Sequence, residues 1–192
     1  MNTKNKRLFI TGIPTSGKSY LAKKLASAVG GIAVPLDDFR ESLASNVTYK
    51  KWTNFYLDVD EEKYLKETNA VDQWKNLVNQ SEGLWPAFLE KINSYKSENK
   101  PIIFECVNML PHLAKRSLNF PGIVLIGETF EETFARNHGN PRWGNTMELQ
   151  ELEARAFFYN ERPNYKSEAE KYGYPVFESA DKAFATALSL LK

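Results

Sequence analysis

The residues with the clearest capacity for chemistry form one short segment near the start of the chain, Gly-Ile-Pro-Thr-Ser-Gly-Lys-Ser at positions 12–19. It fits the pattern G-x-x-x-x-G-K-[ST], in which glycines let backbone N–H groups point inward at a phosphate chain. In this pattern Lys18 reaches the β- and γ-phosphates, and the Ser19 hydroxyl ligates Mg²⁺. We therefore expect nucleotide binding at this phosphate loop. The expected contacts come from Gly12, Pro14, Thr15, Ser16, Gly17, Lys18, Ser19 and Tyr20.

A pair of carboxylates, Asp37 and Asp38, follows the second apolar run of the chain. In an open α/β sheet, residues just past the carboxyl ends of the strands line the ligand crevice, so Asp37 is expected to face the nucleotide. Transfer of a phosphoryl group to a hydroxyl needs a carboxylate that takes or orients the proton, and Asp37 is the candidate. Asp38 has capping-box spacing with Glu41 and is expected to cap the next helix. The alternative is that both aspartates are only turn and cap residues.

One carboxylate, Glu105, ends an otherwise apolar run. Because burial of an unpaired carboxylate is costly, Glu105 must be paired, hydrogen-bonded or close to a metal. We expect it either to hold a water of the Mg²⁺ shell or to accept a hydrogen bond from a substrate hydroxyl. The alternative is a structural glutamate paired with a lysine or arginine.

Arginines gather in the last third of the chain: Arg136 and Arg142 flank a group of loop-forming residues, and Arg155 and Arg162 follow. A closing arginine stabilises the charge on a transferred phosphoryl group and helps to exclude water. The alternative is that these arginines pair in solvent with nearby glutamates, namely Glu131, Glu132, Glu151 or Glu153.

Five short apolar runs are expected to be strands, at 8–11, 32–36, 102–106, 123–126 and 175–177. They alternate with helical stretches, which predicts a parallel sheet flanked by helices. Continuous hydrophobicity indicates strands that are buried on both faces. Pro35 removes a ladder donor and predicts an edge strand or a bulge.

Two longer excursions interrupt this alternation, within what we expect to be a single domain, 1–192. A helical insertion at about 40–98 is expected over the edge of the sheet, because apolar residues recur at helical spacing in two places. These are Val71, Trp74, Leu77 and Val78, and then Trp85, Phe88, Leu89, Ile92 and Tyr95. A capping box at Thr129 opens a helix before a lid at about 136–146. A further helix is expected from about Thr146 to Arg162, where Pro163 stops it.

Composition limits the classes of function. The chain has 192 residues, 42% of them hydrophobic, and 25 Lys and Arg against 24 Asp and Glu give a net charge of +1. Nucleic acid is therefore not favoured as a partner. The polar start lacks a long apolar run, which predicts a cytoplasmic protein without a membrane segment. The single cysteine, Cys106, excludes an internal disulfide and is expected to be a small buried thiol.

The phosphate loop followed by Asp37-Asp38-Phe39 resembles the P-loop kinases of small hydroxyl compounds, such as the nucleoside and gluconate kinases. This resemblance implies a three-layer α/β fold of the nucleoside-monophosphate-kinase type with a five-stranded parallel sheet, ATP and Mg²⁺ as cofactors, and Asp37 as catalytic base. It also places lid arginines between the fourth and fifth strands, which implies Arg136 and Arg142.

Two further segments resemble narrower families. The string at 37–42 is similar to the polynucleotide 5′-hydroxyl kinases, where the arginine at the Arg40 position contacts a substrate phosphate. The segment that begins at Glu105 resembles the Glu-Gly-Val-x-x-x-Pro segment of proteins similar to 2-phosphoglycerate kinase, with Cys106 in place of the glycine.

The sequence thus predicts an ATP-dependent phosphotransferase that acts on a hydroxyl of a small, anionic metabolite, with Arg40 binding the acidic group. Selection of adenine is expected near 179–180. The alternatives are a polynucleotide 5′-hydroxyl kinase and a nucleotide-binding regulator that hydrolyses slowly.

Overall fold

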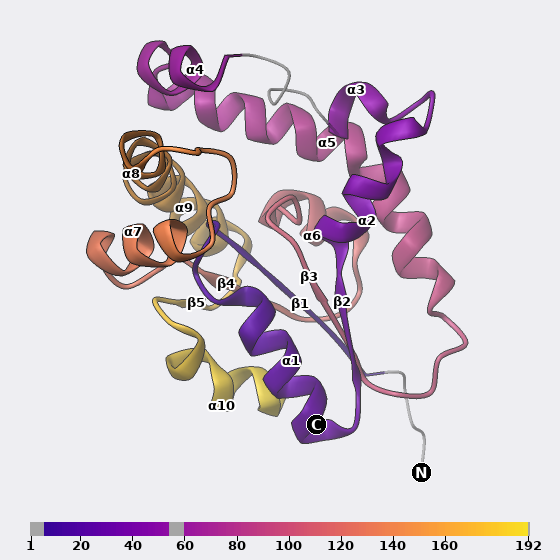
Figure 1. Cartoon of the computed structure of the whole chain (residues 1–192). Helices are drawn as coiled ribbons and strands as arrows, with labels where there is room; N and C mark the ends of the chain where they lie inside the picture. The colour runs from indigo at the N-terminus through magenta and orange to yellow at the C-terminus, as the bar shows by residue number, and fades with distance from the viewer. Residues whose placement is uncertain (1–5, 54–59, 192) are drawn as a thin grey trace.

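A computed structural model describes residues 6–53 and 60–191 of the chain, and its centre is a parallel sheet (Figure 1). The strands are β1 (Arg7–Gly12), β2 (Ile32–Pro35), β3 (Ile102–Glu105), β4 (Gly122–Leu125) and β5 (Val176–Phe177). Their order is β2-β3-β1-β4-β5, and every pairing is parallel. The five predicted strands are confirmed, and Pro35 lies on an edge strand as its missing N–H requires.

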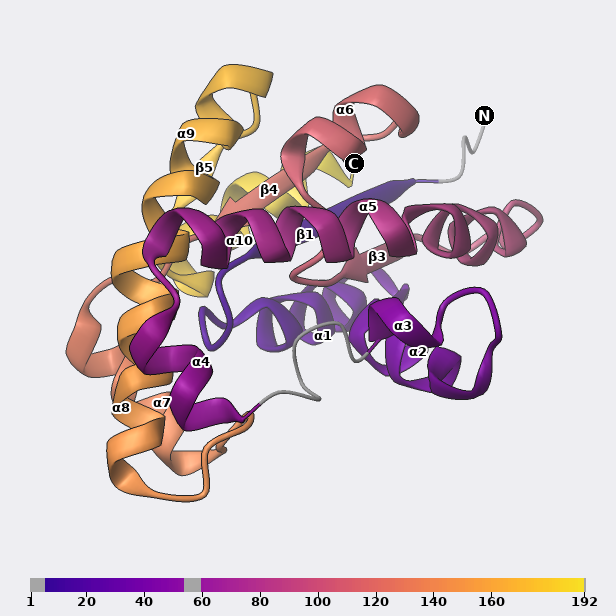
Figure 2. The ribbon, with the colours of Figure 1, turned by 90° about the horizontal axis from the view of Figure 1, so that it is seen from above.

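Helices cover both faces of the sheet, which gives three layers (Figure 2). One face, with Leu8 and Ile10 of β1, packs against α1 (Lys18–Val29) and α10 (Ala180–Leu190). The other face, with Phe9 of β1, packs against three helices: α5 (Ala70–Ser94), α6 (Pro111–Ser117) and α9 (Arg162–Tyr172). Successive strand residues point to opposite faces, so the continuous apolar runs supply both cores.

The described residues between β2 and β3 lie mostly in helices. They include α2 (Leu36–Ser42), the 3-10 helix η1 (Leu43–Ser45), α3 (Lys50–Thr53), α4 (Glu61–Glu67) and α5. The two predicted apolar stripes lie on one helix, the 25-residue α5. Its Leu84 and Phe88 share a core with Phe9 and Phe104 of the central strands, so α5 covers a face of the sheet and not its edge. Val71, expected in the first stripe, is 76% exposed.

The aromatic residues of this segment serve the core. Trp85 is 3% exposed, and its indole N–H donates to Ser117 Oγ at 3.0 Å. Trp52 and Trp74 are partly buried against the same core. Two further aromatic residues of the predicted insertion, Phe55 and Tyr56, lie outside the described residues.

The predicted cap at Asp38 is wrong. Helix α2 begins at Leu36 with Pro35 as its N-cap, and no side chain caps it. The helix starts earlier than the capping-box spacing suggested, because β2 ends at Pro35 and the chain turns at once. Asp37 and Asp38 therefore lie in the first turn, where a carboxylate interacts favourably with the helix dipole.

The lid segment begins as predicted and continues differently. Helix α7 (Phe130–Gly139) starts at Thr129, whose hydroxyl accepts from the Glu132 N–H. After α8 (Met147–Arg155) the chain passes through a π-helix, η2 (Ala156–Glu161), directly into α9. Pro163 does not stop the helix, because it lies in the first turn of α9, where the π turn has already interrupted the α-helical bonding.

Among the residues that the structure describes, no helix has the length and apolar character needed to cross a membrane.

Candidate active site

The phosphate loop joins β1 to α1 and has the backbone that its glycines permit. Gly12 has φ 129°, and a Cβ there would lie 1.8 Å from the carbonyl oxygen of Leu125 in β4. Gly17 caps α1 in a left-handed conformation. Inside the loop, Ser16 Oγ donates to the Ile13 carbonyl at 2.8 Å. The loop is therefore a preformed turn at the positive end of α1, which suits an anion.

Lys18 is the first residue of α1, and its side chain folds back over the loop. Only 6% of the residue is exposed, and Nζ donates to the Ile13 carbonyl at 2.7 Å. Burial lowers the pKa of Lys18, while the nearby carboxylates of Asp37 and Glu105 act to raise it. A lysine held in this way presents a concentrated positive charge to the cleft.

Glu105 lies beside the loop at the end of β3 and contacts Ser19. Ser19 Oγ donates to Glu105 Oε1 at 2.9 Å, and Glu105 is 3% exposed. Burial raises the pKa of Glu105, and the Lys18 charge opposes that rise. Within the described residues, the buried Oε2 has no hydrogen-bond partner.

This pair of oxygens is the donor set that fits Mg²⁺. A hydroxyl lies next to a carboxylate that has a buried, unused oxygen, and Mg²⁺ in nucleotide sites takes one or two protein oxygens together with phosphates and waters. The described residues contain no cluster of three or more His, Cys, Asp or Glu side chains arranged for a metal.

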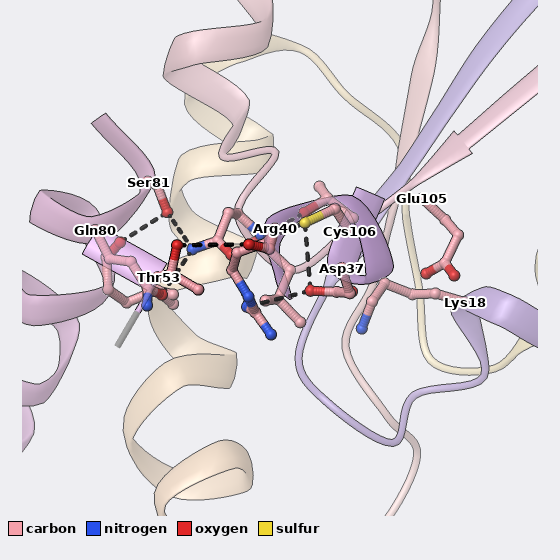
Figure 3. Close-up of polar contacts among 12 residues, drawn as sticks. Lys18, Asp37, Arg40, Thr53, Gln80, Ser81, Glu105 and Cys106 are labelled. Atoms are coloured by element: carbon pink, nitrogen blue, oxygen red, sulfur yellow. Dashed lines mark hydrogen bonds and ion pairs between the residues drawn. The ribbon is translucent and has the colours of Figure 1, made fainter. Parts of the chain in front are cut away.

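Asp37 faces Lys18 and Glu105 from the first turn of α2 (Figure 3). Its Oδ1 lies 3.2 Å from Arg40 NH1 and accepts from the Cys106 thiol at 3.4 Å. Arg40 NH1 also donates to Asn108 Oδ1 at 3.0 Å. Cys106 is fully buried, as predicted, and burial raises the pKa of its thiol.

Asn108 extends this polar network to α5. Its Nδ2 donates to Gln80 Oε1 at 3.0 Å and to Ser81 Oγ at 2.9 Å. Gln80 in turn donates to the carbonyl of Trp52 at 3.0 Å. The side chain of Arg40 is thus connected through Asn108 to α5, on the opposite side of the cleft from Lys18 (Figure 3).

One cleft of about 680 Å³ joins these groups to the lid. Of the predicted site residues, those that line it are Pro14, Thr15, Gly17, Lys18, Ser19, Tyr20, Asp37, Arg40, Glu105, Arg136 and Arg142. Gly12 and Ser16 lie buried beneath the loop surface. Sequence reasoning missed Gln80, Trp143, Glu153 and Phe157, which also line the cleft. A buried polar residue on the apolar stripe of α5 was the available signal for Gln80.

The four arginines in the last third of the chain fall into two groups, those that line the cleft and those that do not. Arg136 NH1 donates to the Thr15 carbonyl of the phosphate loop at 3.2 Å, and Arg142 lies near enough to Lys18 to lower its pKa. Arg136 also pairs with Glu132 at 3.4 Å, and Arg155 pairs with Glu151 on the surface at 2.7 Å without lining the cleft. Arg162 donates to the Ile126 carbonyl at 3.1 Å. The structure therefore brings Arg136 and Arg142 to the cleft and leaves the other two in structural contacts.

The loop between α7 and α8 is anchored on both sides. Glu153 Oε2 accepts from the Gly144 N–H at 3.2 Å and from Asn137 Nδ2 at 3.0 Å. Across from it, the ring of Trp143 packs against Tyr64 of α4 with centroids 5.8 Å apart. Lys66 of α4 pairs with Glu148 of α8 at 3.1 Å. The lid segment thus rests against the helical segment between β2 and β3.

The loop after β5, where adenine selection is expected, also approaches the phosphate loop. Ser179 caps α10, and the Ala180 Cβ lies 3.4 Å from the position of a Cβ on Gly17. The expectation of an adenine contact at this loop stays a prediction.

Comparison with solved structures finds the same fold. Shikimate kinase from Acinetobacter baumannii in complex with shikimate has a TM-score of 0.55 and 15% identity, with 97% of this chain and 95% of that chain covered. An uncharacterized protein from Eubacterium ventriosum has a TM-score of 0.50 and 12% identity, with 98% of each chain covered. A gluconokinase from Sinorhizobium meliloti was also matched, with a TM-score of 0.48, 14% identity, and 97% of this chain and 91% of that chain covered, but it adds no support for the fold.

The sequence itself matches no protein-family model and no curated protein. The structural likeness nevertheless establishes the fold class, which is the P-loop kinase fold of the nucleoside-monophosphate-kinase type. The narrower resemblances to 2-phosphoglycerate kinase and to polynucleotide kinases stay predictions.

Proposed function

We propose that the protein transfers the γ-phosphate of ATP to a hydroxyl of a small, anionic metabolite. The observation that carries this proposal is the single cleft in which the phosphate loop, Asp37 and the lid arginines meet. The fold shared with shikimate kinase is consistent with such a reaction. A hydrolytic switch would not need a carboxylate across from Lys18 to receive an acceptor proton.

The residues have separable roles in this proposal. The backbone of the phosphate loop and Lys18 bind the β- and γ-phosphates, and Arg136 and Arg142 stabilise the charge on the transferred group. Ser19 and Glu105 would hold Mg²⁺, which when bound neutralises phosphate charge. Asp37 accepts the proton of the acceptor hydroxyl. The hydroxyl oxygen bonds to the γ-phosphorus while the bond between that phosphorus and the ADP oxygen breaks.

Arg40 gives the acceptor side its proposed preference for an anion. Its guanidinium lines the cleft next to Asp37, and its position is fixed by Asn108. An acceptor that carries a carboxylate or phosphate would place that group against Arg40 and its hydroxyl against Asp37. The 680 Å³ of the cleft, shared with the nucleotide, favours a small acceptor over a polymer.

The test is ADP release from Mg-ATP against a panel of hydroxyl compounds that includes hydroxy acids, phosphoglycerates, nucleosides and a 5′-hydroxyl oligonucleotide. In Asp37→Asn, acceptor-stimulated release should fall by about 100-fold or more, because general-base catalysis contributes at least that much. Nucleotide affinity, measured by calorimetry, should stay within about twofold, since Asp37 contacts no phosphate in this proposal.

The matched control is Asp72→Asn, which removes the same charge from the first turn of another helix, α5, on the exposed surface. It should leave both quantities unchanged. Equal losses of affinity and transfer in Asp37→Asn would make Asp37 a structural residue. Stimulation by the oligonucleotide alone would favour the polynucleotide kinase, and release that no acceptor stimulates would favour the regulator.

A further inference from the structure

The catalytic carboxylate proposed above has an unusual neighbour in Cys106. The residue follows Glu105 directly, is fully buried, and occupies the position where the segment it resembles has glycine. Its sulfur lies 3.4 Å from Asp37 Oδ1, and the thiol is the donor (Figure 3). A glycine at this position would leave Asp37 without that contact.

The sulfur also accepts a hydrogen bond, from the backbone N–H of Asn108 at 3.3 Å. The three groups form a chain in which the Asn108 N–H donates to the sulfur and the thiol donates to the carboxylate. Hydrogen bonds in such a chain polarise and strengthen one another. The turn after β3 therefore fixes the direction in which the thiol proton points.

A second acceptor for the thiol is present but is farther away. Asn108 Oδ1 lies 3.8 Å from the sulfur, against 3.4 Å for Asp37 Oδ1. Because a carboxylate is also the stronger acceptor, the geometry and the chemistry both favour Asp37.

The thiol and Arg40 make their contacts with the same carboxylate oxygen. Arg40 NH1 lies 3.2 Å from Oδ1, as the thiol does at 3.4 Å. Two donors on one oxygen fix the rotation of the carboxylate about its last side-chain bond. In the contacts described here, Oδ2 is left as the oxygen that meets the acceptor hydroxyl.

We propose that Cys106 is a positioning residue, whose thiol donates to Asp37 Oδ1 and so turns Oδ2 toward the acceptor hydroxyl. The catalytic consequence rests on the proposed function, whereas the hydrogen bond itself does not. No group is transferred to or from the sulfur, which keeps its proton throughout.

The hydrogen bond can be tested directly by infrared spectroscopy. The chain has one cysteine, so the S–H stretching band of the protein arises from Cys106 alone. In the unmodified protein the band should lie at low frequency, as for a thiol bonded to a carboxylate. In Asp37→Ala it should shift to higher frequency, and in the control Asp38→Ala it should not move. A band with the same position in all three proteins would overturn the proposal.

The catalytic consequence is tested by kinetics with the acceptor found in the panel above. Cys106→Ala should lower kcat by about 3- to 10-fold, the effect of losing one hydrogen bond, with KM for ATP unchanged. Cys106→Ser keeps a donor of similar size and should restore most of kcat. In an Asp37→Ala background, Cys106→Ala should have no further effect.

These outcomes separate the two proposals. A residue that served only packing would lower the remaining activity of Asp37→Ala as well, and Cys106→Ser would not rescue it. Either result would overturn the positioning role. If the infrared band shifts as expected while no acceptor stimulates ADP release, the hydrogen bond stands and the proposed function fails.

Discussion

Lys18 is a buried side chain whose charge depends on the carboxylates around it. It is almost wholly buried, and burial alone would favour its neutral form, as the lowered pKa indicates. The nearby carboxylates of Asp37 and Glu105 offset this effect. A phosphate chain placed against Lys18 would add further negative charge, so nucleotide binding should raise the pKa of Lys18 and favour its protonated form.

Arg136 and Arg155 provide a matched pair for testing the lid. Each is paired with a glutamate four residues earlier, but only Arg136 also contacts the phosphate loop. Arg136→Ala should lower kcat by about 10- to 100-fold, because it removes charge stabilisation of the transferred group. Arg155→Ala should change kcat by less than about twofold. Steady-state kinetics on both variants, with equal losses in the two, would contradict the role of Arg136.

At the scale of elements, the phosphate loop is a fixed turn between β1, β4 and α1. Its conformation depends on Gly12, where a Cβ would enter the carbonyl of Leu125, and not only on the groups that face the cleft. Substitutions at positions that would not contact a nucleotide should therefore still disturb the loop and lower the stability of the protein.

Gly12→Ala should lower the free energy of unfolding by at least about 3 kcal/mol, because the new methyl group clashes with the backbone of β4 and the φ of 129° is strained for alanine. Gly30→Ala is the control. Gly30 also has a positive φ, 63°, but a Cβ there meets nothing within 4 Å, so the cost should be about 1 kcal/mol. Urea unfolding of both variants measures the difference, and equal costs would contradict the clash.

The sequence allowed prediction of the elements whose signals are local. The five strands, the phosphate loop, the Thr129 cap and the edge position of Pro35 all depend on neighbouring residues. The single long α5 could not be predicted, because the polar residues Gln80 and Ser81 interrupt its apolar stripe. Both are buried and accept hydrogen bonds from Asn108, which approaches from another part of the chain.

For the candidate site, the sequence predicted the motif residues but not the contacts between distant segments. The residues that bring motif chemistry were found, and the structure places Lys18, Asp37, Glu105 and Arg136 around one cleft. The contacts of Asn108 with Arg40 and of Cys106 with Asp37 were not predicted. They join residues that are far apart in the sequence, and no local pattern shows that the two segments lie side by side.

For the whole molecule, the loop between α7 and α8, which lines the cleft, packs against α4. Besides the contacts of Trp143 and Lys66, the buried Oε1 of Glu61 lies where a Cβ on Gly144 would be 2.9 Å away, and no hydrogen-bond partner for it is found in the described ranges. Burial raises the pKa of Glu61 to about 7, and the charges of Glu153 and Asp60 act in the same direction. The contact between lid and α4 should therefore depend on pH.

Between its ordinary pKa near 4.5 and about 7, Glu61 keeps its proton in the folded state and loses it in the unfolded state. The free energy of unfolding should thus fall as pH rises through this window. Glu61→Gln removes the dependence, and at pH 8 it should be more stable than the unmodified protein by about 1 kcal/mol, after allowance for solvent screening. At pH 4 the two should be equal.

Urea unfolding at both pH values measures this effect. The control is Glu67→Gln, a substitution of an exposed glutamate on the same helix, which should not reproduce the gain at pH 8. A variant at Glu61 that gains nothing at pH 8 would show that the carboxyl ionises freely in the folded protein.

The π turn of η2 has a consequence for how the lid can vary in length. It lies in an unbroken helical path from α8, whose Glu153 lines the cleft, to α9, whose Tyr165 and Ala169 are fully buried in the core. Deletion of one residue from the first α-helical turns of α9 would turn α8 and η2 by about 100° relative to the rest of α9. Glu153 and Phe157 would then leave the cleft while the sheet stayed intact. The orientation of α8 relative to the core therefore depends on the number of residues in this path, so changes of length are expected to be tolerated in the 140–146 loop and not in the α-helical turns.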